Sequence, residues 1–226
     1  MQSEHSYWIQ VEEARAVQHQ LAGKVISEGE IEISEVKTIL GVDAAVTCDR
    51  QHIIGAAVLL CYPSLTVDYI SVAQHKLDFP YIPGFLSFRE IPVLLKAIAK
   101  TPKEPELVIV DGQGIAHPRL FGLASHLGVV TGLRTIGCAK NRLVGECGEL
   151  GREKGEYVPC TMQGILVGYQ VRTRTGVKGV WVSPGHRIGH LAAVHWILRT
   201  ITRFRLPEPI RFAHNAANEY RQSIGG

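Results

Sequence analysis

Residues 105–114, PELVIVDGQG, form a continuous apolar run that ends in an Asp-Gly pair. A run of this kind is typical of a strand in a parallel sheet, where both faces are buried. The chain continues with helical spacing over residues 119–132 and with another short apolar run over residues 133–140. This order predicts two strands with a helix between them.

The residues before this unit have a different pattern. Three runs rich in β-branched residues, 38–49, 52–63 and 66–77, are joined by short turn-like segments and predict an antiparallel meander. Helical spacing precedes them at residues 7–27 and follows them at residues 89–100. A meander followed by alternating helices and strands predicts an α/β fold, in which helices flank one mixed sheet.

The last part of the chain adds further elements. Residues 141–162 are polar and rich in glycine, and we interpret them as a loop. Residues 164–173 and 179–186 predict a hairpin. Two helices are expected over residues 187–201 and 206–221, the second begun by prolines.

The length and composition bound the class of protein. The 226 residues, of which 46% are hydrophobic, suit one globular domain over residues 1–226, with a packing helix before a core at about residues 36–222. No apolar run approaches the roughly 20 residues that span a membrane. The N-terminal residues do not resemble a signal peptide, so we expect a cytoplasmic protein.

The cysteines are scattered and include no CxxC pair. We therefore expect neither a disulfide framework nor a zinc site. The five residues are Cys48, Cys61, Cys138, Cys147 and Cys160.

Positive charge is concentrated near the C-terminus. The net charge is +3, but residues 172–211 hold eight Lys and Arg residues against one acid, Glu208. Such an excess is typical of a surface that attracts a polyanion. A solvated helix face is the alternative.

Two carboxylates occupy unusual positions. Asp43 lies inside an apolar run, and Asp111 ends the run quoted first. If the first meander strand lies beside the first parallel strand, the two carboxylates meet, and either a proton or a cation must relieve their repulsion. Mg²⁺ favours such a pair together with phosphate oxygens. Taken singly, Asp43 could pair with an arginine and Asp111 could cap a turn.

Glu90 ends a stiff aromatic stretch, DFPYIPGFLSFRE, at residues 78–90. Ser87 and Glu90 match a capping box, in which the glutamate caps its own helix. Pro92 would lie too deep in a helix capped by Ser87, so we expect the helix to begin nearer Arg89. Glu90 would then be free to face the two aspartates.

A histidine and a lysine complete the candidate set. His214 lies among alanines on the last expected helix, where a packed histidine is the alternative to a functional one. Lys140 ends a short strand, where it could neutralise a phosphate or remain solvated.

Five motifs, in their order and spacing, closely resemble the endonuclease V family from about residue 36 to the C-terminal helix. They are GVDAAV (41–46), YIPGFLSFRE (81–90), VDGQGIAHPRLFGLASHLG (110–128), TIGCAKNRL (135–143) and RLPEPIRFAHNAA (205–217). One departure is Gln113, which stands where many members of the family have histidine or asparagine.

The resemblance implies a ribonuclease H-like fold and a DNA repair endonuclease that needs Mg²⁺, with Mn²⁺ as a substitute. It implies cleavage at the second phosphodiester 3′ to a deaminated purine, chiefly inosine, leaving 3′-hydroxyl and 5′-phosphate ends. DNA with deaminated bases would be the partner. Inosine-containing RNA, hybrid or branched nucleic acid, and a non-catalytic binding module are the alternatives.

The resemblance also implies roles for individual residues. Asp43 and Asp111 match the metal ligands of the family. Glu90 and His214 match further active-site residues that bind or orient a second metal or the attacking water, and Lys140 matches a phosphate-facing lysine. The expected substrate-binding residues are Tyr81, whose side chain matches a wedge beside the extruded base, Pro83, Gly84, Gly112, Gly114, His117 and Gly137.

Overall fold

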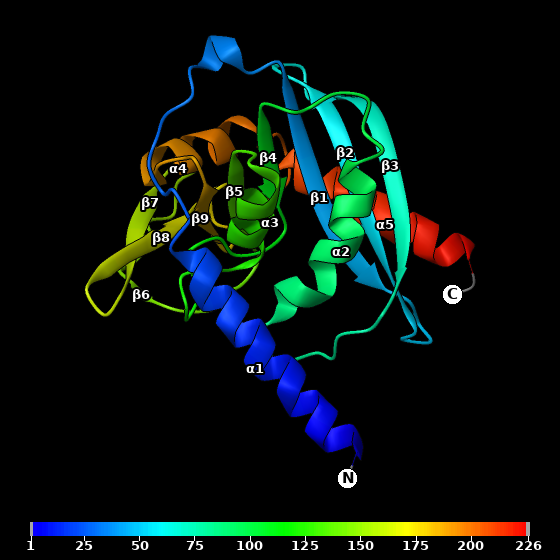
Figure 1. The fold of residues 1–226 in the computed structure, drawn as a ribbon. Coiled ribbons are helices and arrows are strands. Elements are labelled where there is room, and N and C mark those ends of the chain that lie inside the picture. The colour runs from blue at the N-terminus through cyan, green and yellow to red at the C-terminus, as the bar shows by residue number, and fades with distance from the viewer. Residues whose placement is uncertain (1, 225–226) are drawn as a thin grey trace.

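The fold is given by a computed structural model that describes residues 2–224 (Figure 1). The helices are α1 (Gln2–Ala22), the short 3-10 helix η1 (Ile33–Glu35), α2 (Leu86–Ile98), α3 (Leu123–Thr131), α4 (His190–Arg199) and α5 (Glu208–Ser223). The strands are β1 (Thr38–Val46), β2 (His52–Cys61), β3 (Thr66–Lys76), β4 (Leu107–Val110), β5 (Thr135–Ala139), β6 (Glu146–Cys147), β7 (Tyr157–Met162), β8 (Ile165–Val171) and β9 (Val180–His186).

One mixed sheet organises the described residues. Its nine strands follow the order β3-β2-β1-β4-β5-β9-β8-β7-β6. The strands β1, β2 and β3 form the predicted antiparallel meander, and β1, β4 and β5 are parallel neighbours. The strands β8 and β9 pair as the predicted hairpin. These predictions of strand order are confirmed.

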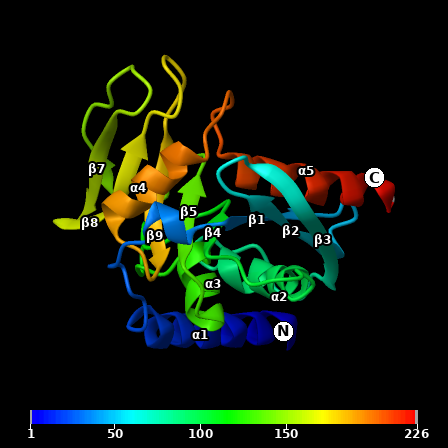
Figure 2. The ribbon, with the colours of Figure 1, turned by 90° about the horizontal axis from the view of Figure 1, so that it is seen from above.

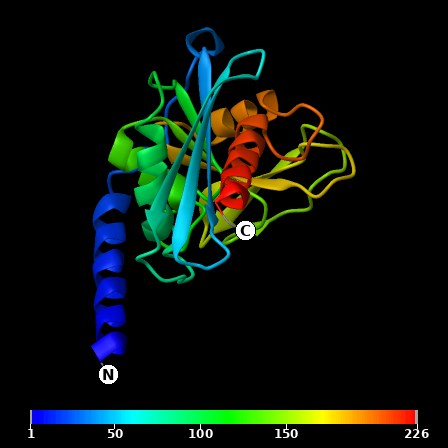
Figure 3. The same cartoon turned by 90° about the vertical axis from the view of Figure 1, so that its right-hand side faces the viewer.

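Helices cover both faces of the sheet. In Figure 2, α2 and α3 lie on one face, while α4 and α5 lie on the other. Because both faces are covered, the side chains of β4 are buried without alternation, as the continuous apolar run at residues 105–114 predicted. Most side chains of β2 are buried in the same way. The helix α1 lies outside the layer of α2 and α3, and its N-terminal end extends beyond the rest of the fold (Figure 3).

A glycine in β1 sets the position of α5. A Cβ atom on Gly41 would lie 1.9 Å from the carbonyl oxygen of Pro209, so only glycine lets the helix approach the strand this closely. Two strand residues advance about 6.6 Å, and five helical residues advance about 7.5 Å. Gly41 and Asp43 share one face of β1, and the packing of α5 on this face extends to Asp43, where Nδ1 of His214 lies 2.7 Å from Oδ2.

The helix ends differ from their predicted positions. The first helix was expected over residues 7–27 but ends at Ala22. The helix α2 begins at Leu86, earlier than the expected start near Arg89, and Pro92 lies inside it. No capping box forms, because Ser87 lies within the helix and its hydroxyl pairs with Nδ1 of His126 at 3.0 Å.

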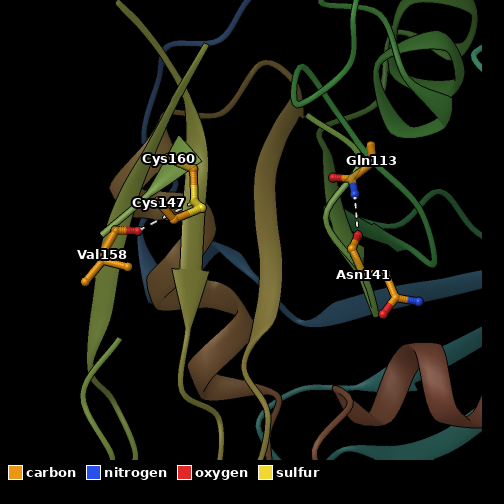
Figure 4. Close-up of a disulfide and its surroundings, with 5 residues drawn as sticks. All are labelled: Gln113, Asn141, Cys147, Val158 and Cys160. Atoms are coloured by element: carbon orange, nitrogen blue, oxygen red, sulfur yellow. Dashed lines mark hydrogen bonds between the residues drawn. A yellow bond between two sulfur atoms is a disulfide. The ribbon is translucent and has the colours of Figure 1, made fainter. Parts of the chain in front are cut away.

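The interpretation of residues 141–162 as a loop is wrong, because β6 and β7 lie there and extend the sheet. The expectation that the cysteines form no disulfide is also wrong for one pair. The register of β6 and β7 places Cys147 opposite Cys160, and the two residues are bonded (Figure 4). Both errors have one cause, since short polar edge strands lack the apolar alternation that reveals buried ones.

None of the helices within residues 2–224 combines the length and the apolar character needed to cross a membrane.

The packing of α5 on β1 predicts the effect of adding one methyl group. We expect Gly41→Ala to lower the free energy of unfolding by about 3 kcal/mol, because the added carbon overlaps backbone atoms that cannot rotate away. Gly148→Ala, where the added Cβ meets no atom within 4 Å, is the control and should change it by less than about 0.5 kcal/mol. Urea denaturation measures both, and wild-type stability of Gly41→Ala would contradict the packing described.

Candidate active site

The two aspartates meet because their strands are parallel neighbours. Val42 of β1 lies opposite Val110 of β4, so the residues that follow them are also side by side. The backbone N–H of Asp111 donates to the carbonyl oxygen of Val42 at 3.2 Å and continues this register past the end of β4. The side chains of Asp43 and Asp111 are only 12% and 10% exposed.

Each aspartate has one partner of opposite or variable charge. Nδ1 of His214 lies 2.7 Å from Oδ2 of Asp43, and Nζ of Lys140 lies 2.5 Å from Oδ2 of Asp111. Asp43, Asp111 and His214 each offer one ligand atom, and these atoms lie within 4.8 Å of one another. Two carboxylate oxygens and an imidazole nitrogen at this spacing are a donor set that can hold a divalent cation.

Glu90 adds a third carboxyl group to this site. Burial, reinforced by the negative charges of Asp43 and Asp111, raises the pKa of Glu90 well above its usual range. Burial and the charge of Asp111 also raise the pKa of Asp43 to about 6. Lys140 and Arg89, the two cations that lower these pKa values, do not balance three carboxylates, so the site favours either a bound proton or an added cation.

Asn218 is a member of the site that the sequence did not reveal. Its amide nitrogen lies 3.1 Å from Nε2 of His214, one helical turn away on α5, and 2.8 Å from the carbonyl oxygen of His214. An amide nitrogen is a donor, so Nε2 accepts and the ring proton lies on Nδ1, facing Asp43. Only the i, i+4 spacing to His214 could have indicated this residue.

Arg205 is a second residue that the sequence did not single out. Its guanidinium donates to the carbonyl oxygens of Lys140, Lys178 and Gly179, at 2.7, 2.8 and 2.8 Å. These bonds hold the end of β5, and with it Lys140, at the site.

Three other arginines of the basic segment 172–211 are also engaged in bonds within the protein. Arg172 and Arg187 donate to backbone carbonyls, and Arg211 pairs with Glu208. A phosphate-binding role of this segment therefore stays a prediction. It concerns the Lys and Arg side chains of the segment that remain free at the surface.

A cavity of about 130 Å³ begins beside Asp111. It is lined by five of the seven expected substrate-binding residues, which are Tyr81, Pro83, Gly84, Gly112 and His117. The other two, Gly114 and Gly137, do not line it. A Cβ on Gly114 would lie 1.9 Å from the carbonyl oxygen of Pro184, and one on Gly137 would lie 2.3 Å from the amide nitrogen of Gly114. These two glycines therefore allow backbone segments to pack closely.

Gln113 also lines the cavity and connects it to the loop after Lys140. Its Nε2 donates to the carbonyl oxygen of Asn141 at 2.9 Å (Figure 4), whereas its Oε1 is buried and has no hydrogen-bond partner. The departure from the family pattern at this position thus lies at the wall of the cavity.

Tyr81 lies between this cavity and a larger groove. The groove measures about 740 Å³, and its lining includes Tyr81 together with Arg50 and Arg89. The Tyr81 side chain is exposed, with 68% of the residue surface accessible, and the Arg89 guanidinium lies 5.9 Å from its ring centre. An exposed aromatic ring between two hollows is placed to contact a ligand that enters either of them.

The raised pKa of Asp43 predicts how Mg²⁺ stabilises the protein at different pH values. Without a cation, the stability that Asp43 contributes is present below pH 3.8 and is lost as the pH rises through about 6. A cation needs the ionised form, so Mg²⁺ should raise the melting temperature more at pH 8 than at pH 5. Thermal melts of the wild type and of Asp43→Asn test this expectation. Equal shifts at both pH values, or an undiminished shift in the variant, would contradict it.

Comparison with known proteins identifies relatives over nearly the whole chain. The model of the family described as Endonuclease V matches residues 19–215. An Endonuclease V of Nostoc sp. is 43% identical over 95% of this chain and 96% of the relative. The crystal structure of the Endonuclease V from Streptomyces avermitilis has a TM-score of 0.91, with 40% identity over 95% of this chain and 94% of that one.

A third relative was solved with nucleic acid. The Endonuclease V of Ciona intestinalis, in complex with a 24mer DNA containing an inosine followed by a ribo-adenosine, has a TM-score of 0.83 and 28% identity. The match covers 95% of this chain and 99% of that one. These comparisons confirm the predictions of a ribonuclease H-like fold and of a nuclease, and the chain belongs to the endonuclease V family.

Proposed function

We propose that this nuclease cuts DNA at the second phosphodiester 3′ to a deaminated purine, chiefly inosine, and leaves 3′-hydroxyl and 5′-phosphate ends. The observation that carries the proposal is the convergence of Asp43, Asp111 and His214 beside a cavity that begins at Gly112. The inosine-containing DNA bound to the relative from Ciona intestinalis supports this choice of substrate. The reaction would serve the repair of deaminated DNA.

Members of the endonuclease V family are metal-dependent nucleases, and Asp43, Asp111 and His214 form a possible site for the metal. We propose Mg²⁺, because it favours one or two carboxylates together with phosphate oxygens, and Mn²⁺ accepts the same ligands. When bound, such a cation polarises a phosphoryl oxygen and stabilises the negative charge that develops during cleavage.

The protein's own groups complete this chemistry. While no cation is bound, the Nδ1–H of His214 orients the carboxylate of Asp43, and Asn218 holds the ring. To serve as a ligand, His214 would carry its ring proton on Nε2 and offer Nδ1 to the cation. Lys140, held by Asp111 and by Arg205, supplies fixed positive charge where a phosphate would lie.

Two alternative roles are proposed for Glu90. Burial of its carboxyl group, together with the charges of Asp43 and Asp111, raises its pKa well above the usual range. It would either orient the attacking water or bind a second cation. Both alternatives use its closeness to Asp43 and Asp111, whose charges act on its carboxyl group.

The cavity would receive the base after the nucleotide is extruded from the stack. Extrusion costs a few kcal/mol and costs less at a mismatched base, which favours a deaminated base over a normal one. The backbone at Gly84 and Gly112 can approach a base edge closely because these residues have no side chain. The exposed ring of Tyr81 would fill the gap left in the stack.

Three further predictions from the sequence are retained as proposals. Inosine-containing RNA would be an additional substrate, since the cavity selects a base rather than a sugar. The basic segment 172–211 would hold the phosphate backbone on either side of the lesion without sequence preference. The enzyme would act in the cytoplasm.

Cleavage of matched duplexes tests the proposed function. We expect the wild type with Mg²⁺ to cut a strand with one inosine at the second phosphodiester 3′ to it, and to leave the matched adenosine strand intact. Asp43→Asn should slow cleavage at least about 100-fold and retain binding, because it removes a ligand charge at nearly constant volume. Glu104→Gln, at an exposed acid, is the control. Equal cutting of both strands, or binding of inosine DNA without cleavage, would contradict the proposal.

The exposure of Tyr81 predicts a variant that separates recognition from stability. Tyr81→Ala should reduce the preference for the inosine strand about tenfold, since stacking of a base on an aromatic ring contributes roughly 1–3 kcal/mol. The melting temperature should stay near that of the wild type because the side chain is largely exposed. Tyr69→Ala, on the edge strand β3, is the matched control. A loss of preference that merely follows a loss of folded protein would argue against a contact with the substrate.

A further inference from the structure

One backbone carbonyl in the wall of the base cavity accepts hydrogen bonds from three side chains. The oxygen belongs to Gly84, which adopts a left-handed conformation with φ +81°. The amide of Gln18 donates to it at 2.9 Å, and the guanidinium of Arg119 donates at 2.6 Å. Nε2 of His117 lies 3.1 Å away. Donors from two separate segments, α1 and residues 117–119, thus converge on the loop that carries Tyr81.

His117 also acts as a donor to this oxygen. The backbone N–H of Arg119 donates to Nδ1 of His117 at 3.2 Å, which leaves the ring proton on Nε2, facing the Gly84 carbonyl. Burial, with the charge of Arg119, lowers the pKa of His117 to about 4, so the ring is neutral at pH 7. The two walls of the cavity, one containing Gly84 and the other containing His117, are therefore joined at this single carbonyl.

Gln18 is the residue through which α1 joins this set of hydrogen bonds, and it is fully buried. Its Nε2 donates to the Gly84 carbonyl, and its Oε1 accepts from Nε of Arg119, so both ends of the amide are used. A helix that only covered an apolar surface would place an apolar side chain here, because burying an amide has a cost that hydrogen bonds must offset. Val11 and Ala14 of α1 also form an apolar cluster with Phe85 of the loop.

Arg119 connects α1 to both walls of the cavity. Besides its bonds to Gln18 and Gly84, its guanidinium lies over the ring of Phe85, 4.3 Å from the ring centre. Phe85 follows Gly84 directly and is itself buried. Arg119 and Gln18 therefore hold the C-terminal end of the aromatic loop, while Tyr81 at its other end remains exposed.

We infer that Gln18 and Arg119 are positioning residues for recognition of the base, and that they act through their hydrogen bonds to the Gly84 carbonyl. They fix the loop of residues 79–85, and with it Tyr81 and the opening of the cavity. They take no direct part in phosphodiester cleavage at Asp43. The inference rests on the proposed function of that cavity. It also gives α1 a role in substrate recognition, although Gln18 lies just before residues 19–215, which the family model matches.

Two variants on one helix test this role. Gln18→Ala removes both hydrogen bonds of the buried amide, and Gln20→Ala, at an exposed position on the same helix, is the matched control. We expect Gln18→Ala to raise KM for the inosine strand about tenfold, close to the effect of losing one hydrogen bond, and to change kcat less than about twofold. Amide hydrogen exchange near Phe85 should accelerate, since its N–H is held by Ile82 within the same loop. Gln20→Ala should match the wild type in all three measurements.

The outcomes separate the inference from the proposed function. An unchanged KM in Gln18→Ala would overturn the positioning role. So would a fall in kcat that is as large as the rise in KM and that accompanies a fall in the melting temperature. Arg119→Lys keeps the charge but loses the forked donor, so it should reproduce the rise in KM. If the wild type shows no preference for inosine, the proposed function fails. Amide hydrogen exchange near Phe85 would still test whether Gln18 holds the Gly84 carbonyl. Unchanged protection of these amides in Gln18→Ala would overturn the inference.

Discussion

The repulsion between two carboxylates, Asp43 and Asp111, is the constraint on which the site depends. The parallel pairing of β1 and β4 brings them together with little access to water. Each pairs with only one side chain, His214 or Lys140, and Glu90 adds further negative charge. Such an arrangement is costly in a protein without a cation, and it becomes favourable when a divalent ion and a phosphate enter.

The surrounding packing serves this arrangement. Gly41 removes a side chain from β1 so that α5 can lie against the strand and deliver His214. Gly114 and Gly137 allow the segments after β4 and within β5 to pack closely, which leaves Asp111 and Lys140 side by side. Glycines in strands and strand ends usually weaken a sheet, but here they allow the backbone to approach closely enough to build the site.

Most of the sheet could be predicted from the sequence because its buried strands are long and apolar. The antiparallel meander and the neighbouring positions of Asp43 and Asp111 follow from such patterns. The β6 and β7 strands and the bond between Cys147 and Cys160 did not, since short polar edge strands have no distinctive period. Gln18 was also missed, because one glutamine among several on a polar helix shows no sign that it is buried.

The central claim is that a cation at Asp43, Asp111 and His214 acts beside a base held in the neighbouring cavity. A crystal structure of the protein with inosine-containing DNA and Mn²⁺, analysed by anomalous scattering, tests it most directly. The account predicts an anomalous peak within coordination distance of both aspartates, and the hypoxanthine ring in the cavity between Gly84 and His117. A peak away from the aspartates, or an inosine that stays stacked in the duplex, would contradict it.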